Sequence, residues 1–195
     1  MKKGYIRKLT VTAMLSAISV VLMYLQIGLP FMPSFIQFDF SDLPALIGAY
    51  AFGPLSGVCI CALKNLLHLF NTTTAGVGEL SNFILGTLFV LPAGLLYKYK
   101  KNRKNAFLGA LIGSFVMAVT GVFTNYFIIY PLFYRLGMSH DMILGMYQAI
   151  LPSIDHMLEA LAIFNLPFTF AKGLVVAGIC LLIYKPLSPI LKGKK

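Results

Sequence analysis

Two lysines stand inside long apolar segments of the sequence, where a charge is costly. Lys64 lies in segment 54–70 and Lys172 in segment 161–187. Insertion scales put a charge at the bilayer centre at roughly 2.5–3.5 kcal/mol, so each lysine needs an opposite charge or a wet cavity. Two interpretations stay open for each: a structural lysine that is salt-bridged or snorkels, or a lysine that lines a cavity.

Polar side chains recur at helical spacing near Lys172. Asn165, Thr169 and Lys172 follow one another at steps of four and three, which places them in one stripe of a helix. Pro167 interrupts this stripe, leaves the carbonyl of Ile163 without a donor, and predicts that the helix begins afresh there. The stripe points to hydrogen bonding inside the bundle.

Other apolar segments carry polar residues at a similar depth. Glu79 and Asn82 are three residues apart and share a helix face, and Asn125 lies late in its segment. Membrane asparagines often hold helices together. Because all of these residues fall toward one side of the membrane, a shared polar cavity is the simpler interpretation.

The sequence lacks the motifs of common catalytic and metal sites. It has no Gly-x-x-x-x-Gly-Lys-Ser/Thr phosphate loop and no Gly-x-Ser-x-Gly elbow. His156 and Glu159 share a helical face without the second histidine of a zinc motif. We therefore predict neither an enzyme nor a metal site.

Composition identifies the environment in which these polar residues must lie. Of the 195 residues, 58% are hydrophobic and 11% are charged, whereas a soluble domain has about 25% charged residues. The chain is predicted to be an all-α, multi-pass protein of the cell membrane. Its net charge of +10 is explained by orientation in the bilayer, so no nucleic-acid partner is expected.

The apolar pattern predicts a bundle of six transmembrane helices. They are expected at 9–29, 42–52, 54–70, 80–97, 106–133 and 161–187, with Gly53-Pro54 turning the chain between the second and third. Thirteen of the 16 basic residues form three clusters: Lys2, Lys3, Arg7 and Lys8; Lys98, Lys100, Lys101, Arg103 and Lys104; and Lys185, Lys192, Lys194 and Lys195. The positive-inside rule places these clusters, and both termini, in the cytoplasm.

The connections between the helices complete a single integral membrane substrate-binding domain over residues 1–195. The two longest, 26–42 and 134–160, then lie outside, and the second is expected to contain a short interfacial helix near 142–151. Long outer connections over a small bundle are typical of a capped substrate cavity.

Small residues four apart predict close helix contacts. Such pairs are Gly53/Gly57, Gly109/Gly113, Gly173/Ala177 and Ala13/Ala17. Most should pack inside the bundle. Ala13 and Ala17 lie on the first helix, at the edge of the chain, and are the pair expected to meet a partner protein.

Several motifs together resemble one known family. They are 13–17 (AMLSA), 39–44 (DFSDLP), 52–57 (FGPLSG), 64–67 (KNLL), 81–83 (SNF), 125–127 (NYF) and 166–173 (LPFTFAKG). Over about residues 5 to 187 the chain resembles the riboflavin-specific S components of energy-coupling-factor (ECF) vitamin transporters. The resemblance implies a subunit that captures riboflavin from outside, needs no cofactor, and docks on one transmembrane coupling protein and two ATPases.

The resemblance also implies roles for individual residues. Ala13 and Ala17 match the small residues that face the coupling protein. Asn125 and Lys172 match the asparagine and lysine that hydrogen-bond the flavin ring. The family's helix-6 motif usually has asparagine where this chain has Thr169, so that ring contact falls to Thr169, to Asn165 or to water.

The chemistry of riboflavin suits the polar and aromatic residues singled out. An asparagine amide offers a donor and an acceptor to the carbonyl and N–H edge of the ring, and a lysine donates to a carbonyl. The apolar end of the ring needs walls, for which the candidates are Phe31, Phe38, Phe40 and Leu43. Asp42, Glu79 and Asn82 are expected near the ribityl hydroxyls, and Lys64 is a further candidate for the cavity lining.

Two alternatives stay open at this stage. The chain could be an S component for another vitamin, such as thiamine or folate. It could also be a structural membrane protein whose polar residues only hold helices together.

Overall fold

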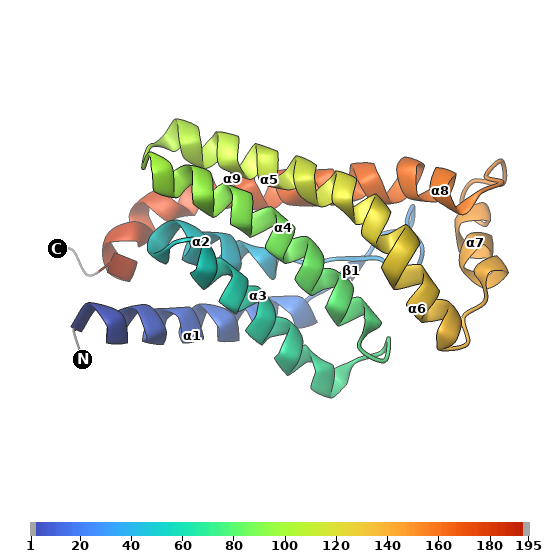
Figure 1. The fold of residues 1–195 in the computed structure, drawn as a ribbon, viewed down its shortest axis with the longest axis horizontal. Coiled ribbons are helices and arrows are strands. Elements are labelled where there is room, and N and C mark those ends of the chain that lie inside the picture. Colours follow the sequence, from blue (N-terminus) through green and yellow to red (C-terminus); the bar gives the residue numbers. More distant parts are fainter. Residues whose placement is uncertain (1–2, 193–195) are drawn as a thin grey trace.

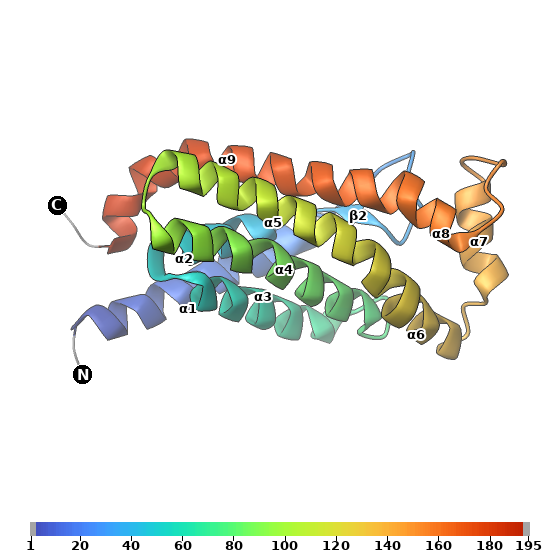
Figure 2. The ribbon, with the colours of Figure 1, turned by 45° about the horizontal axis from the view of Figure 1, so that its top comes forward.

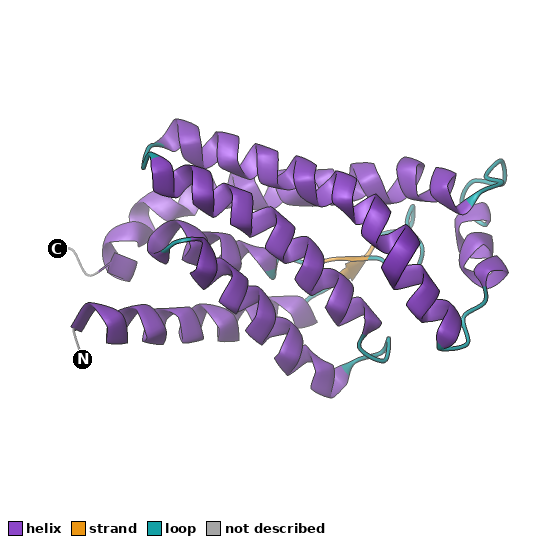
Figure 3. Cartoon of the chain, viewed as in Figure 1, coloured by secondary structure: helices purple, strands orange, loops and turns teal. Residues whose placement is uncertain are grey.

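The computed structural model describes residues 3–192, and helices account for most of them (Figure 3). The six longest helices are α1 (Lys3–Tyr24), α2 (Asp42–Phe52), α3 (Pro54–His68), α4 (Val77–Tyr99), α5 (Arg103–Thr124) and α9 (Leu166–Lys192). The shorter helical elements are η1 (Leu69–Asn71), η2 (Asn125–Ile129), α6 (Tyr130–Arg135), α7 (His140–Gln148), α8 (Met157–Ala160) and η3 (Leu161–Asn165). Lys2, Lys194 and Lys195 of the basic clusters lie outside the described residues.

Four helices in the described part of the chain are long and apolar enough to cross a membrane. They are Gly4–Tyr24, Val77–Tyr99, Arg103–Arg135 and Met157–Pro189. The last two are continuous runs that include the shorter elements η2 and α6, or α8 and η3. The helices α2 and α3, of 11 and 15 residues, fall short of the roughly 20 residues of a full crossing.

The helix containing Pro167 does not begin afresh at that proline, contrary to the sequence expectation. One π-helical turn, η3, precedes Pro167, and the chain continues into α9 without a break. Pro131 follows the other π turn, η2, in the same way. Since a proline cannot donate to the carbonyl four residues before it, a local widening of the helix accommodates its ring without ending the run.

Most predicted helix positions agree with the structure, and α2 has the predicted bounds. The predicted interfacial helix corresponds to α7. The first helix differs, because it ends at Tyr24 rather than near residue 29. The apolar residues beyond it pair in an antiparallel ladder between β1 (Ile27–Gly28) and β2 (Gln37–Phe38), a long-range contact that hydropathy does not indicate.

The helices lie roughly along one axis, and their connections gather at its two ends (Figure 1). The start of α1, the end of α9, the α2–α3 junction and the α4–α5 connection share one end. The other end holds the strands, the α3–α4 connection and the helices α6 to α8. A view turned by 45° shows the same separation of the two ends (Figure 2).

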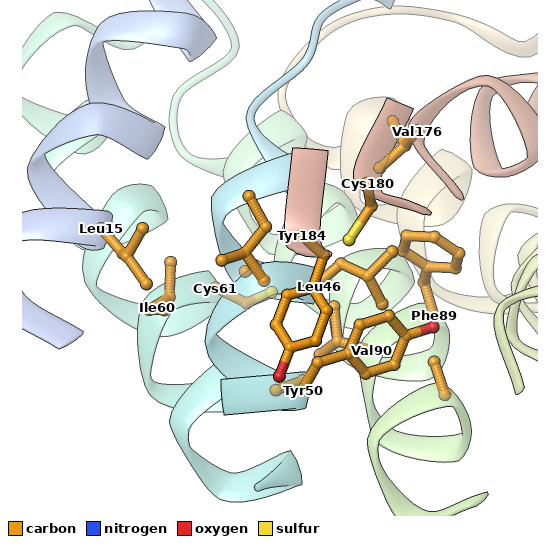
Figure 4. Close-up of a cluster of buried hydrophobic side chains, with 14 of the residues drawn as sticks. Leu15, Leu46, Tyr50, Ile60, Cys61, Phe89, Val90, Val176, Cys180 and Tyr184 are labelled. Atoms are coloured by element: carbon orange, nitrogen blue, oxygen red, sulfur yellow. The ribbon is translucent and has the colours of Figure 1, made fainter. Parts of the chain in front are cut away.

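Two clusters of buried apolar side chains form the core. The first, drawn in Figure 4, joins α2, α3, α4 and α9 through residues such as Leu46, Ile60, Phe89 and Val176. The second surrounds Tyr130 and Tyr147 toward the end that holds α6 to α8. A cavity with polar and apolar lining residues lies where the two clusters meet, since it takes lining residues from both of them.

Glycines allow α4 and α5 to pack backbone against backbone. A Cβ atom added at Gly109 would lie 2.9 Å from the carbonyl oxygen of Ala93, and one at Gly113 would overlap the carbonyl of Phe89. A Cβ atom added at Gly57 of α3 would likewise lie 2.9 Å from the carbonyl oxygen of Ala45 in α2. These contacts confirm that the predicted pair Gly109/Gly113 packs within the bundle. Of the pair Gly53/Gly57 only Gly57 does, since a Cβ atom at Gly53 would meet nothing within 4 Å.

The substitution Gly113→Ala is expected to lower the free energy of unfolding by about 1–3 kcal/mol, because backbone atoms cannot move aside for the new methyl group. The matched control is Gly178→Ala, where an added Cβ meets nothing within 4 Å. SDS-induced unfolding in detergent, followed by circular dichroism, measures both. Equal stability of the two variants would contradict the close packing of α4 on α5.

Candidate ligand-binding cavity

A cavity of about 150 Å³ lies inside the bundle, toward the end that holds the strands. It is lined by polar, aromatic and aliphatic side chains from β2, α2, α4, α5, η2, α6, η3 and α9, and from the connections before β2 and α4. The lining residues are Phe35, Ile36, Gln37, Asp42, Thr74, Gly78, Ser81, Asn82, Leu85, Met117, Asn125, Ile129, Tyr130, Phe133, Asn165, Phe168, Thr169 and Lys172. Asn125 and Lys172, which the sequence singles out, therefore face the same cavity.

Two lysines and two aspartates form a buried charge cluster at the cavity. Lys172 Nζ lies 2.7 Å from Asp39 Oδ2 and 3.8 Å from Asp42 Oδ2. Lys64 Nζ lies 2.6 Å from both Asp42 Oδ1 and Ser41 Oγ. The attraction between the two ammonium and the two carboxylate groups offsets the free-energy cost of burying them. The lysines therefore do not need a ligand to be tolerated inside the bundle.

The charge cluster includes Asp39, a residue that sequence reasoning did not assign to the site. Its other oxygen, Oδ1, accepts the backbone N–H of Ser41 at 2.7 Å, which shapes the turn into α2. Burial alone would raise the pKa of the Asp39 carboxyl, but the ammonium groups of Lys172 and Lys64 hold that pKa well below its usual range. Asp39 is therefore ionised and holds the Lys172 ammonium group in place.

Asn125 opens the π turn η2, and its side chain is 7% exposed. Its Oδ1 accepts a long hydrogen bond of 3.4 Å from Ser81 Oγ of α4. The structure records no other hydrogen bond of this amide within residues 3–192. π turns are frequent at functional sites, and this one presents an amide with spare hydrogen-bonding capacity to the cavity.

Asn165 ends the second π turn and belongs to a closed ring of hydrogen bonds. Its Nδ2 donates to Tyr130 Oη at 3.2 Å, the hydroxyls of Tyr130 and Tyr147 lie 2.5 Å apart, and Tyr147 Oη donates to Asn165 Oδ1 at 2.7 Å. The ring joins α6, α7 and η3, and it occupies much of the Asn165 amide. For Thr169, one turn further on, no hydrogen bond of the hydroxyl is recorded among the described residues.

Two buried amide oxygens at the cavity have no hydrogen-bond partner in the described part of the chain. They are Gln37 Oε1 and Asn82 Oδ1. A buried acceptor without a partner costs about 1–3 kcal/mol. Both residues line the cavity, so a small movement of either amide would bring its unpartnered oxygen to a bound molecule.

Six residues nominated from the sequence do not line this cavity. Phe31 and Phe38 line a separate pocket. Lys64 is fully buried within the charge cluster, and Leu43 packs against the first core cluster. Phe40 packs edge-on against Phe38, with ring centroids 5.0 Å apart. Glu79 lines a different pocket, and its carboxylate is hydrogen-bonded by other side chains.

The carboxylate of Glu79 organises the connection between α3 and α4. Its Oε1 lies 2.7 Å from His68 Nδ1, and its Oε2 accepts the hydroxyls of Thr72 at 2.9 Å and Thr74 at 3.2 Å. The expectation that Glu79 and Lys64 contact a ligand is thus not supported, because each has its polar atoms engaged by protein groups.

The structure adds lining residues that sequence reasoning missed. Phe35, Phe133 and Phe168 supply aromatic surface in place of Phe31, Phe38 and Phe40, and Tyr130 adds an aromatic edge. Phe168 belongs to the motif 166–173, so its position in the sequence could have indicated that it lies at the site. Nothing in the sequence indicates that the connection 25–41 folds back so that Phe35 reaches the cavity.

The small residues of α1 divide between two faces. Thr12 and Ser16 are buried, whereas Ala13 and Ala17 are exposed. The Ser19 hydroxyl on the inner face donates to the carbonyl of Ser41, beside the charge cluster. One face of α1 thus contacts the site region, and the other is open.

Apolar helices of membrane-spanning length around a cavity with several polar lining residues are typical of a membrane protein that binds a small molecule. The family described as "ECF transporter, substrate-specific component" matches residues 7–187. The chain therefore belongs to this family. It is a multi-pass protein of the cell membrane and, like its relatives, a transport protein rather than an enzyme.

Individual relatives agree with this assignment. The chain is 32% identical to the riboflavin transporter RibU of Staphylococcus aureus over 95% of this chain and 93% of that protein. It is 35% identical to the riboflavin transporter FmnP of Bacillus subtilis over 94% of this chain and 93% of that protein. A solved structure of the S component of a bacterial ECF transporter matches with a TM-score of 0.74 and 32% identity, over 95% of this chain and 97% of that one.

Proposed function

We propose that this protein binds riboflavin at the outer side of the membrane and delivers it to an ATPase-driven partner module. Its similarity to riboflavin transporters supports the ligand. The observation that carries the proposal is that Asn125, Lys172, Gln37 and Asn82 all line one cavity. Two of their amide oxygens have no partner in the described residues. A neutral molecule rich in donors and acceptors matches that set.

The flavin ring is proposed to lie against Asn125 and Lys172. The Asn125 amide can pair with the carbonyl and N–H edge of the ring. Lys172 has three N–H bonds, and after donating to Asp39 it retains donors for a ring carbonyl. Thr169 is better placed than Asn165 for the remaining ring contact, because tyrosines already engage the Asn165 amide.

The ribityl chain is proposed to contact the hydrogen-bond acceptors of the cavity lining. Its hydroxyl groups can donate to Gln37 Oε1 and Asn82 Oδ1, which lack other partners in the described residues. Asp42, which lines the cavity while it pairs with Lys64, is a further acceptor. The apolar end of the ring would pack against Phe35, Phe133 and Phe168.

The cavity must widen to admit a molecule of this size. Its volume of about 150 Å³ is below the roughly 300–1,000 Å³ of pockets for drug-sized ligands. Phe35, Ile36, Gln37 and Thr74 are the lining residues that lie outside the helices. We propose that these connections move aside when the ligand enters.

The arrangement of charges supports a bundle of six membrane segments with both termini in the cytoplasm. Lys98, Arg103 and Lys185 lie at the end where α1 begins and α9 ends. The positive-inside rule assigns this end to the cytoplasm, so the cavity would open outward. The α2–α3 hairpin would then supply two short segments, and residues 1–195 would form a single substrate-binding domain.

Partner docking is proposed on the exposed face of α1. Ala13 and Ala17 present a flat surface on which another helix can pack closely. The coupling protein of an ECF module, with its two ATPases, would be the partner. The Ser19–Ser41 hydrogen bond would connect this face to the cavity region.

Riboflavin binding tests the proposed function directly. The detergent-purified chain is expected to show flavin absorption, or to quench riboflavin fluorescence in a saturable one-to-one titration. Thiamine and folate, added in tenfold excess, should not displace it.

Other outcomes would assign a different function. Saturable binding of thiamine or folate without riboflavin would make this an S component for another vitamin. The absence of any saturable binding by a folded protein would favour a structural role for the polar residues.

A further inference from the structure

A second cavity, of about 610 Å³, lies at the opposite end of the bundle from the ligand cavity. It is formed between the α4–α5 connection and the last turns of α9. Three cationic side chains line it: Lys101 from the connection, Arg103 from the start of α5 and Lys185 from α9. The proposed riboflavin site uses none of these residues.

The three cations have no acidic partner in the described part of the chain. All three residues are exposed, and no ion pair is recorded for any of them within residues 3–192. The acids of the neighbouring helices, Asp42 of α2 and Glu79 of α4, contact Lys64 and His68 instead. The cavity therefore carries an uncompensated positive charge.

The remaining lining is mostly apolar and aromatic, with Asn102 and Ser188 as its uncharged polar residues. Leu182 of α9 is 73% exposed within a membrane-spanning helix. Its side chain would therefore contact the acyl chains of the surrounding lipids. Tyr97 and Tyr184 lie beside the cations, at the level where tyrosines meet the headgroup region. The volume exceeds that of a single phosphate ion and suits a headgroup with the start of its chains.

We infer that this cavity binds an anionic phospholipid, with the phosphate between Lys101, Arg103 and Lys185 and an acyl chain along Leu182. Basic pockets between membrane helices are known to hold anionic headgroups. A charged headgroup supplies the missing anion, and its chain covers apolar surface on α9. The inference depends on the membrane location of the chain and not on the identity of its transported ligand.

Native mass spectrometry of the full-length chain in detergent tests the site. We expect the protein to retain phosphatidylglycerol at least tenfold more strongly than phosphatidylcholine. The triple variant Lys101→Gln/Arg103→Gln/Lys185→Gln should bind phosphatidylglycerol about 100-fold more weakly, because each cation near an anionic headgroup strengthens binding roughly fivefold.

The control variant is Lys98→Gln/Lys100→Gln/Lys104→Gln. It removes the same charge from the same region of the chain, but none of its residues lines the cavity. It should retain phosphatidylglycerol. Both variants should bind riboflavin as the unmodified chain does, and this readout separates failure of the lipid site from failure of the proposed function.

Three results would overturn the inference. An equal loss of lipid in the two triple variants would mean general attraction to a basic surface. Stabilisation by inorganic phosphate equal to that by phosphatidylglycerol would mean a site for free anions. Loss of coupling-protein capture in the first variant, with no lipid bound by the unmodified chain, would assign the cavity to a protein partner.

Discussion

Lys64→Met is expected to lower the free energy of unfolding by about 3–5 kcal/mol, because it leaves the buried carboxylate of Asp42 without its closest cation. Lys64 is 0% exposed and lies 2.6 Å from Asp42 Oδ1. Methionine fills a similar volume, so the loss measures the charge and not a cavity. SDS-induced unfolding followed by circular dichroism gives the free energies.

Two further variants make the test of Lys64 specific. Lys104→Met changes an exposed lysine and should shift stability by less than about 0.5 kcal/mol. Adding Asp42→Asn to Lys64→Met should recover part of the loss, since it removes the unpaired charge. If Lys64→Met behaved like Lys104→Met, or the double variant were no more stable than Lys64→Met, the buried ion pair would not be a stabilising element.

Asn125→Leu is expected to weaken riboflavin binding by about 100-fold. Leucine has nearly the same shape but offers no hydrogen bond to the polar edge of the ring, and leaving buried polar groups unpaired costs about 1–3 kcal/mol. Stability should change little, because the only bond recorded for this side chain within residues 3–192 is the 3.4 Å contact with Ser81. Titration of purified protein by fluorescence quenching measures the dissociation constant.

Asn65→Leu is the matched control for Asn125→Leu. Asn65 is also a buried membrane asparagine, but its Nδ2 donates to the carbonyl of Cys61 in its own helix at 2.8 Å, and it does not line the ligand cavity. Its riboflavin affinity should stay within about twofold of the unmodified chain. A loss of stability without a loss of affinity in Asn125→Leu would mean that Asn125 only joins helices.

Much of the architecture could be predicted because it depends on local composition. A chain with 11% charged residues must place its helices in lipid, and Gly53-Pro54 can only end one helix and begin the next. Asn125 and Lys172 could be assigned to one cavity because each carries polar atoms that lipid cannot satisfy. Those inferences need only hydropathy and helical geometry.

Only the tertiary structure decided which polar groups meet. Lys172 and Asp39 are 133 residues apart, and their contact depends on the path of the connection 25–41 and on the rotation of α9. The same holds for Glu79, whose carboxylate could have faced the cavity but is held by His68, Thr72 and Thr74. Sequence spacing places a side chain on a helix face, whereas packing of whole helices determines what that face contacts.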